Sequence, residues 1–271
     1  MNEQLDLSIS GSSKMPGGTY KKVTISGAGQ IAGDLRCQTL RCSGAAHLSG
    51  RVDCAGEVHV SGAVDIAQDL VCGQLHSSGS FVCGGTCVCS TLHSSGSTKI
   101  KGKLTGEQVS ASGTLSAEQL HCQKFSASGA LKVSGDVEAE SVRTTGAVTI
   151  GGLLNAEEVN IYPSRHVHIN AIGGGHIVFS DNCTFTLFRR QSRAVVDTIE
   201  ADVIELEYVE ARMVRGRYVR LGEGCKIGTV EYTGSLDNEG GSLIEHITKV
   251  GAQGELPAGQ GQAESAEGEK G

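Results

Sequence analysis

The chain lacks tryptophan and contains only three prolines, five tyrosines and five phenylalanines among its 271 residues. So few aromatic side chains exclude a core built around large aromatic anchors. The 39 glycines instead favour a fold made of regular turns and small packing units. At this length the chain can bury a sizeable core in one large or two small domains.

Basic residues are also scarce. The 23 lysines and arginines are outnumbered by 30 aspartates and glutamates, which gives a formal net charge of -7. We therefore expect no nucleic acid partner, because such binding requires a basic surface. No apolar stretch approaches the roughly 18 residues of a transmembrane helix, and the N-terminus shows no basic start followed by an apolar run. A cytoplasmic location with reduced thiols is expected.

A Ser-Gly or Thr-Gly dipeptide recurs at a nearly constant interval. The intervals between successive glycines are 17, 18, 17, 17, 17, 16 and 17. Such regular self-similarity is typical of repeat proteins. The eight copies are Ser26-Gly27, Ser43-Gly44, Ser61-Gly62, Ser78-Gly79, Ser95-Gly96, Ser112-Gly113, Ser128-Gly129 and Thr145-Gly146.

Apolar residues alternate with polar ones in three short segments of each repeat. This period of two places alternate side chains on opposite faces of a β-strand. Three strands joined by tight corners make one coil, so we expect an all-β parallel β-helix with about 17 residues per coil. The right-handed form is favoured, because the aliphatic positions are spaced four, four and five apart rather than every six.

The inward positions of these segments predict the structural core. It comprises Leu35, Cys37, Leu40, Leu48, Val52, Cys54, Ile66, Leu70, Cys72, Leu75, Cys89, Leu92, Ile100, Leu104, Val109, Val133, Val137, Val142, Ile150, Leu154 and Val159.

The register divides the chain into four segments. We expect a flexible tail over residues 1–18, a regular β-helix of 17-residue coils over 19–161, a continuation with altered coils over 162–235, and a flexible acidic tail over 236–271. Both tails contain too few apolar residues to form a packed core.

An arginine-rich run lies in the third segment. Arg212, Arg215, Arg217 and Arg220 are expected to point to solvent from β-strands. A solvated strand face explains them most simply in so acidic a neighbourhood. A lateral electrostatic contact or an anionic membrane surface is the alternative.

Eight cysteines lie within the repeats, and their phase predicts that they point inward. They are Cys37, Cys42, Cys54, Cys72, Cys83, Cys87, Cys89 and Cys122. Cysteine then serves as a small hydrophobic residue in a narrow core. The alternative is a thiolate metal site made by Cys72, Cys83, Cys87 and Cys89. The CxxC pairs of a zinc site are missing, because the close pair here is Cys87-x-Cys89.

Three histidines follow the same inward position in consecutive coils. His59, His76 and His93 should therefore stack as an outward column about 5 Å apart. Such a column is a candidate transition-metal or pH-sensing site. The alternative is that the residue type repeats only because the coil repeats.

No catalytic motif is present, and we expect neither an enzyme nor a cofactor. The sequence contains no GxSxG, P-loop or HExxH pattern. Hexapeptide acyltransferases require a six-residue period, and polysaccharide lyases require long loops that build a cleft; the chain shows neither feature. A solenoid without a cleft instead presents two open ends, which can pair with further copies.

Several segments resemble the bactofilins, polymer-forming bacterial cytoskeletal proteins, and especially their longer Firmicute members. They are the repeated SGxxxIxGxLxC/A pattern, GLLNAEEVNIY from Gly152 to Tyr162, IELEYVEARMVRG and LGEGCKIGTVEYTG. The resemblance covers about residues 19–235. The chain differs from the shorter bactofilins in its many cysteines and in its second C-terminal section.

This resemblance implies a right-handed β-helix and a homopolymer that forms non-polar filaments without nucleotide. It also implies a scaffold for cell shape, polarity or motility at the inner face of the cell membrane, with envelope or motility proteins as partners. The alternative function is a binding module that uses an exposed repetitive face for a protein or metal. A degenerate acyltransferase is a third possibility, which no motif supports.

Overall fold

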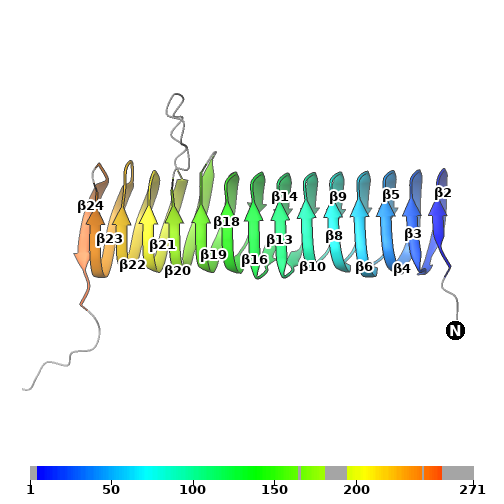
Figure 1. The fold of residues 1–271 in the computed structure, drawn as a ribbon, viewed down its shortest axis with the longest axis horizontal. Helices are drawn as coiled ribbons and strands as arrows, with labels where there is room; N and C mark the ends of the chain where they lie inside the picture. The colour runs from blue at the N-terminus through cyan, green and yellow to red at the C-terminus, as the bar shows by residue number, and fades with distance from the viewer. Residues whose placement is uncertain (1–4, 164–165, 181–193, 240, 252–271) are drawn as a thin grey trace, which may run out of the picture.

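The computed structural model describes residues 5–163, 166–180, 194–239 and 241–251. They form one parallel β-solenoid of about 13 turns with about 17 residues per coil, which confirms the expected fold class. Every strand pair is parallel, and the coils stack along a single axis with β2 and β24 at opposite ends (Figure 1).

Most strands are three to nine residues long, whereas β4 and the strands from β19 to β23 contain 13 to 15 residues. In chain order, the strands are β1 (Leu7–Ile9), β2 (Ser12–Thr19), β3 (Lys22–Ile25), β4 (Ala28–Cys42), β5 (Ala45–Leu48), β6 (Val52–Val60), β7 (Ala63–Ile66), β8 (Leu70–Ser77), β9 (Ser80–Cys83), β10 (Cys87–Ser94), β11 (Ser97–Ile100), β12 (Lys103–Thr105), β13 (Gln108–Ala111), β14 (Thr114–Ala117), β15 (Gln119–His121), β16 (Lys124–Ala127), β17 (Ala130–Val133), β18 (Val137–Thr144), β19 (Ala147–Ile161), β20 (Val167–Phe179), β21 (Ala194–Leu206), β22 (Val209–Leu221), β23 (Lys226–Asn238) and β24 (Leu243–Lys249).

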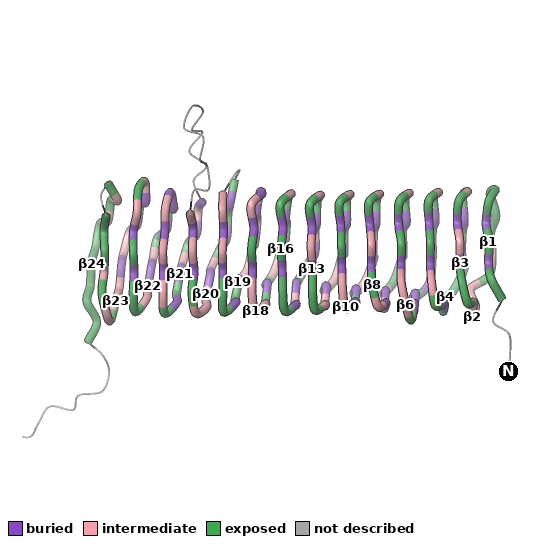
Figure 2. The backbone as a smooth tube through the Cα atoms, viewed as in Figure 1, coloured by how far each residue is buried: buried purple, intermediate pink, exposed green. Residues whose placement is uncertain are grey.

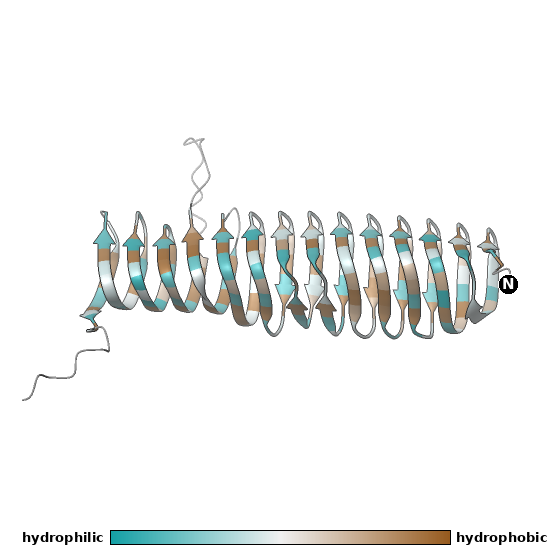
Figure 3. Ribbon diagram, turned by 60° about the horizontal axis from the view of Figure 1, so that its bottom comes forward, coloured by the Kyte–Doolittle hydropathy of each residue, from teal (hydrophilic) through white to brown (hydrophobic). Residues whose placement is uncertain are grey.

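Side chains of one kind stack directly above one another from coil to coil. In the pairing of β8 with β10, Leu75 lies opposite Leu92 and His76 lies opposite His93. Buried and exposed residues alternate along most of the strands between β2 and β24 (Figure 2), and apolar residues alternate with polar ones in the same way (Figure 3). The interior is therefore a set of largely apolar columns, each one residue wide, which also contain the buried hydroxyl residues Ser77, Ser94, Thr98 and Thr144.

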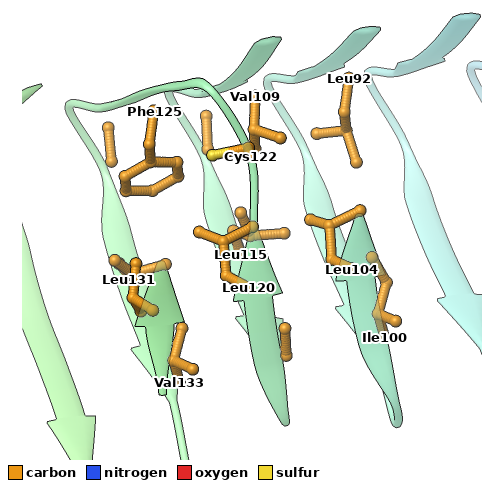
Figure 4. Close-up of a cluster of buried hydrophobic side chains, with 14 of the residues drawn as sticks. Leu92, Ile100, Leu104, Val109, Leu115, Leu120, Cys122, Phe125, Leu131 and Val133 are labelled. Atoms are coloured by element: carbon orange, nitrogen blue, oxygen red, sulfur yellow. The ribbon is translucent and has the colours of Figure 1, made fainter. Parts of the chain in front are cut away.

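All the residues expected in the structural core are at most 7% exposed. Figure 4 shows Leu104, Leu115 and Leu131 pointing into the space enclosed by the coils. Phe81 and Phe179 are the largest of the fully buried side chains. Most positions hold aliphatic residues or cysteine, because the coil interior is narrow.

Glycine is required at the Ser-Gly corner by the close approach of two coils. A Cβ atom at Gly79 would meet the backbone carbonyl oxygen of Gly62, and it would lie 2.6 Å from the carbonyl oxygen of Ser61. No real Cβ contact is this short, so the repeated glycine is a steric requirement of stacking. It is not a requirement for positive φ.

Both predicted tails need correction. The segment 1–18 contains β1 and most of β2, which together begin the first coil, and Leu7 and Ile9 are buried. The segment 236–271 contains β24, which pairs with β23. Residues 1–4, 240 and 252–271 of these segments lie outside the described part of the chain.

The third segment continues the same stack with coils of different length. β20 pairs with β19 so that Val167 lies opposite Val148, a longer interval than in the regular coils. The next step, from Val167 to Ala194, is longer still, and the step from Ala194 to Val209 is shorter than a regular coil. The register is thus preserved in space although the sequence interval changes.

Candidate functional site

The C-terminal end of the solenoid exposes part of its core. Ile247 lies opposite Val230 and so continues an inward column. Val230 is fully buried, whereas Ile247 is 55% exposed, because no described strand lies beyond β24. β24 also covers only residues 226–232 of β23, which leaves Leu236 half-buried. This end therefore presents both apolar side chains and free strand edges.

The N-terminal end is open in the same manner. Met15 lies opposite Ile31, which is buried, but Met15 itself is only partly covered. Tyr20 is likewise half-buried against the core, and Leu5 is 73% exposed. Within the described residues, the two ends are the places where inward columns stop without a further coil to cover them.

The three histidines expected to stack do form an outward column. The ring centroids of His59 and His76 are 6.1 Å apart and tilted by 39°, and those of His76 and His93 are 5.3 Å apart and nearly parallel. The rings line a shallow hollow of about 280 Å³ together with Ser77 and Ser94. Within the described residues no group of three or more His, Cys, Asp or Glu side chains is arranged to hold a metal ion.

The eight repeat cysteines are all buried, as is Cys225, and these nine carry free thiols. Cys183 lies outside the described residues. Burial raises the pKa of the Cys122 thiol to about 12. At Cys42 and Cys83 burial also raises the pKa of the thiol, against a smaller effect of hydrogen bonds to backbone groups.

Two curated proteins of Bacillus subtilis are similar to part of this chain. The uncharacterized protein YhbF is 32% identical over 100 residues, which is 36% of this chain and 42% of YhbF. The uncharacterized protein YhbE is 34% identical over 105 residues, 37% of this chain and 44% of YhbE. The chain thus matches less than half the length of these relatives. No family model matches the chain, and no solved structure matches it.

The four arginines of the arginine-rich run are exposed, and Arg212, Arg215 and Arg220 pair with carboxylates on neighbouring coils. The hydrogen bonds of Arg212 lower the pKa of the Asp197 carboxyl. Arg217 instead lies over the ring of Tyr218, 5.0 Å from its centroid. The arginine run is therefore largely neutralised and is not a free basic patch. The nitrogen-to-oxygen distances are 2.9 Å for Arg212–Asp197, 2.8 Å for Arg215–Glu231 and 2.9 Å for Arg220–Glu239.

Sequence reasoning missed the residues that form the two ends. Ser10-Gly11 is one more copy of the repeated dipeptide, one coil before Gly27, and it indicates the first coil. Gly241 follows Gly224 by 17 residues and, like it, has a positive φ, so the glycine repeat also indicates the corner before β24. Among the described residues no helix is long and apolar enough to cross a membrane.

Proposed function

We propose that this chain is a non-enzymatic cytoskeletal scaffold whose solenoids stack end to end into filaments without nucleotide. The observation that carries the proposal is the exposure of Ile247 at a position that is inward-facing in the coil before it. A second copy seated on this end would pair the free edge of β24 and cover Ile247 as Val230 is covered.

The physical basis is the open edge of a parallel sheet. Exposed strand edges are templates for pairing with another chain, and most β-proteins block them with charges, proline or a covering element. Here β24 presents Leu243 at 65% exposure as well as Ile247. End-to-end contact satisfies the backbone groups of the edge and removes these apolar side chains from water.

The resemblance to the bactofilins extends this proposal. It supports non-polar filaments, in which C-terminal ends meet each other and N-terminal ends meet each other. We further propose a cytoplasmic location at the inner face of the cell membrane. The partners are envelope or motility proteins, which the filament organises in cell shape, polarity or motility.

Electron microscopy of the purified full chain in nucleotide-free buffer tests the proposal. The native chain should form filaments, and the double variant Leu243→Asp/Ile247→Asp should not, because charges on the end oppose contact. Leu153→Asp is the matched control, since Leu153 is 42% exposed on the side of the solenoid, away from both ends.

The size of the species that the double variant forms distinguishes a non-polar filament from a head-to-tail filament. In a non-polar filament the double variant still joins through its N-terminal ends and should give dimers in analytical ultracentrifugation. Monomers would indicate a head-to-tail filament instead. Unchanged filaments from the double variant, or a native chain that stays monomeric at high concentration, would contradict end-to-end assembly.

The histidine column supports a second candidate function, a binding module for a protein or metal partner. The observation in its favour is the nearly parallel stacking of His76 on His93 in an exposed hollow. Titration with Cu²⁺ or Zn²⁺ tests the metal case. Replacing His59, His76 and His93 together by alanine should abolish binding, and the change His47→Ala, outside the column, should not.

A further inference from the structure

Four consecutive coils place a cysteine at the same inward position. Cys37 lies opposite Cys54, Cys54 opposite Cys72, and Cys72 opposite Cys89. Each is at most 7% exposed, and none forms a disulfide. Later coils carry Ala139 opposite Ala156 in this column. The packing therefore accepts alanine here, and the run of four thiols is not explained by size alone.

The spacing of the column suits a two-coordinate ion. Neighbouring parallel strands lie about 4.8 Å apart, which sets the separation of in-register side chains. A metal–thiolate bond of about 2.3 Å puts two sulfurs about 4.6 Å apart when the ion lies on the line between them. A tetrahedral ion needs more ligands, and within the described residues no group of three or more ligating side chains is suitably arranged.

Four thiols in a row contain two neighbouring pairs that share no sulfur, Cys37–Cys54 and Cys72–Cys89. An ion between the sulfurs of each pair uses all four thiols. An ion between Cys54 and Cys72 would instead leave Cys37 and Cys89 each without a neighbouring thiol to share an ion with.

A surface groove gives access to the second pair. Cys72 and Cys89 line a groove of about 560 Å³, in which Gly106 occupies the coil after Cys89. Glycine has no side chain to close the column at this point, so an ion can approach the sulfurs without unfolding of the coil. The other lining residues include the carboxylates Glu107, Glu138 and Glu140, which attract cations.

We propose that the pairs Cys72–Cys89 and Cys37–Cys54 each bind one soft monovalent cation of the Cu(I) class between their two sulfurs. Thiolate ligands select such soft ions over hard ones. On binding, the ion leaves the ligands of its chelator, each thiol proton passes to solvent, two sulfur–metal bonds form, and no electron is transferred. The sites lie inside the coil and do not depend on filament formation.

Anaerobic titration of the reduced full chain with Cu(I), held by a competing chelator, tests the proposal. The native chain should bind two ions, and X-ray absorption should show two sulfur ligands per ion. Cys72→Ala and Cys54→Ala should each lose one ion, and the double variant should lose both. Alanine already occupies this column in other coils, so the variants should keep the native circular dichroism spectrum.

Cys122→Ala is the matched control. Cys122 lies in the same column and is buried, but its neighbours there are Gly106 and Ala139, so it has no partner thiol. This variant should bind two ions. A loss of binding in Cys122→Ala, retention of both ions in the double variant, or a third sulfur ligand from Cys87 would overturn the proposal. Displacement of the bound Cu(I) by equimolar Zn²⁺ would overturn it as well.

Discussion

Replacing Gly79 by alanine tests the steric requirement that stacks the coils. A Cβ at this position would lie 2.6 Å from the carbonyl oxygen of Ser61, whereas ordinary contacts begin at 3.4 Å. The two coils must therefore separate by at least about 0.8 Å, the difference of these distances, and by more to clear the closer carbonyl oxygen of Gly62. The neighbouring backbone resists this separation, because its hydrogen bonds cross the same gap.

Two of those hydrogen bonds determine how much stability Gly79→Ala should cost. The Ser78 amide donates to the Val60 carbonyl at 2.8 Å, and the Ser80 amide donates to the Gly62 carbonyl at 2.9 Å. A separation larger by about 0.8 Å stretches both beyond the usual limit of about 3.2 Å. Each lost bond costs about 0.5–1.5 kcal/mol, and more where the groups stay away from water. Gly79→Ala should therefore lower the free energy of unfolding by about 2–3 kcal/mol.

Urea unfolding followed by circular dichroism measures this change, and the chain supplies two controls. Gly11 occupies the same corner in the first coil, with no atom within 4 Å of its Cβ position, so Gly11→Ala should be nearly neutral. Gly33 has open space but a φ of 95°, so Gly33→Ala should cost about 1–2 kcal/mol through backbone strain alone. Equal stabilities for Gly79→Ala and Gly11→Ala would refute the reasoning.

Three further changes test the core, the surface pairs and the buried thiols. Leu70→Asp should prevent folding, because a carboxylate at this fully buried position has no partner. Val88 is 39% exposed, so the control Val88→Asp should fold normally, as measured by circular dichroism. Since Arg212 lowers the pKa of Asp197, this ion pair stabilises the fold above about pH 4 and loses that contribution at lower pH. Arg212→Ala should remove this part of the acid-unfolding curve, and high salt should have the same effect. An unchanged curve would contradict the pairing. Because burial raises the pKa of Cys122 to about 12, iodoacetamide at pH 8 should alkylate it far more slowly in the folded chain than in urea, and equal rates by mass spectrometry would place it at the surface.

The phase of the repeat made the interior predictable. In a strand, alternate residues face opposite sides, so one Ser-Gly corner fixes the orientation of every residue up to the next corner. Leu70 and Cys72 are inward by this count, and both are buried. The same count predicts that His76 stacks on His93 outside the coil, because paired residues of in-register coils point in the same direction.

The ends were harder to predict because they depend on cooperation between coils. β1 and β24 are short, and each lies in a segment with few apolar residues, so these segments read as free tails in isolation. Each becomes a strand by pairing with a coil that already exists, and Ile9 and Ile244 then pack against that coil. A terminal coil needs only half the contacts of an internal one, so its sequence signal is weaker.

The sequence by itself determined the coil, its corners and the inward direction of its cysteines, because these depend on residues close together in the chain. The tertiary structure decided which residues become neighbours across coils. Cys72 pairs with Cys89 at the regular coil interval, whereas Arg212 pairs with Asp197 across a shorter one. The step from Val167 to Ala194 is longer than either, so no constant interval locates such partners. Backbone hydrogen bonding between stacked strands sets the register, and that register exists only in the folded solenoid.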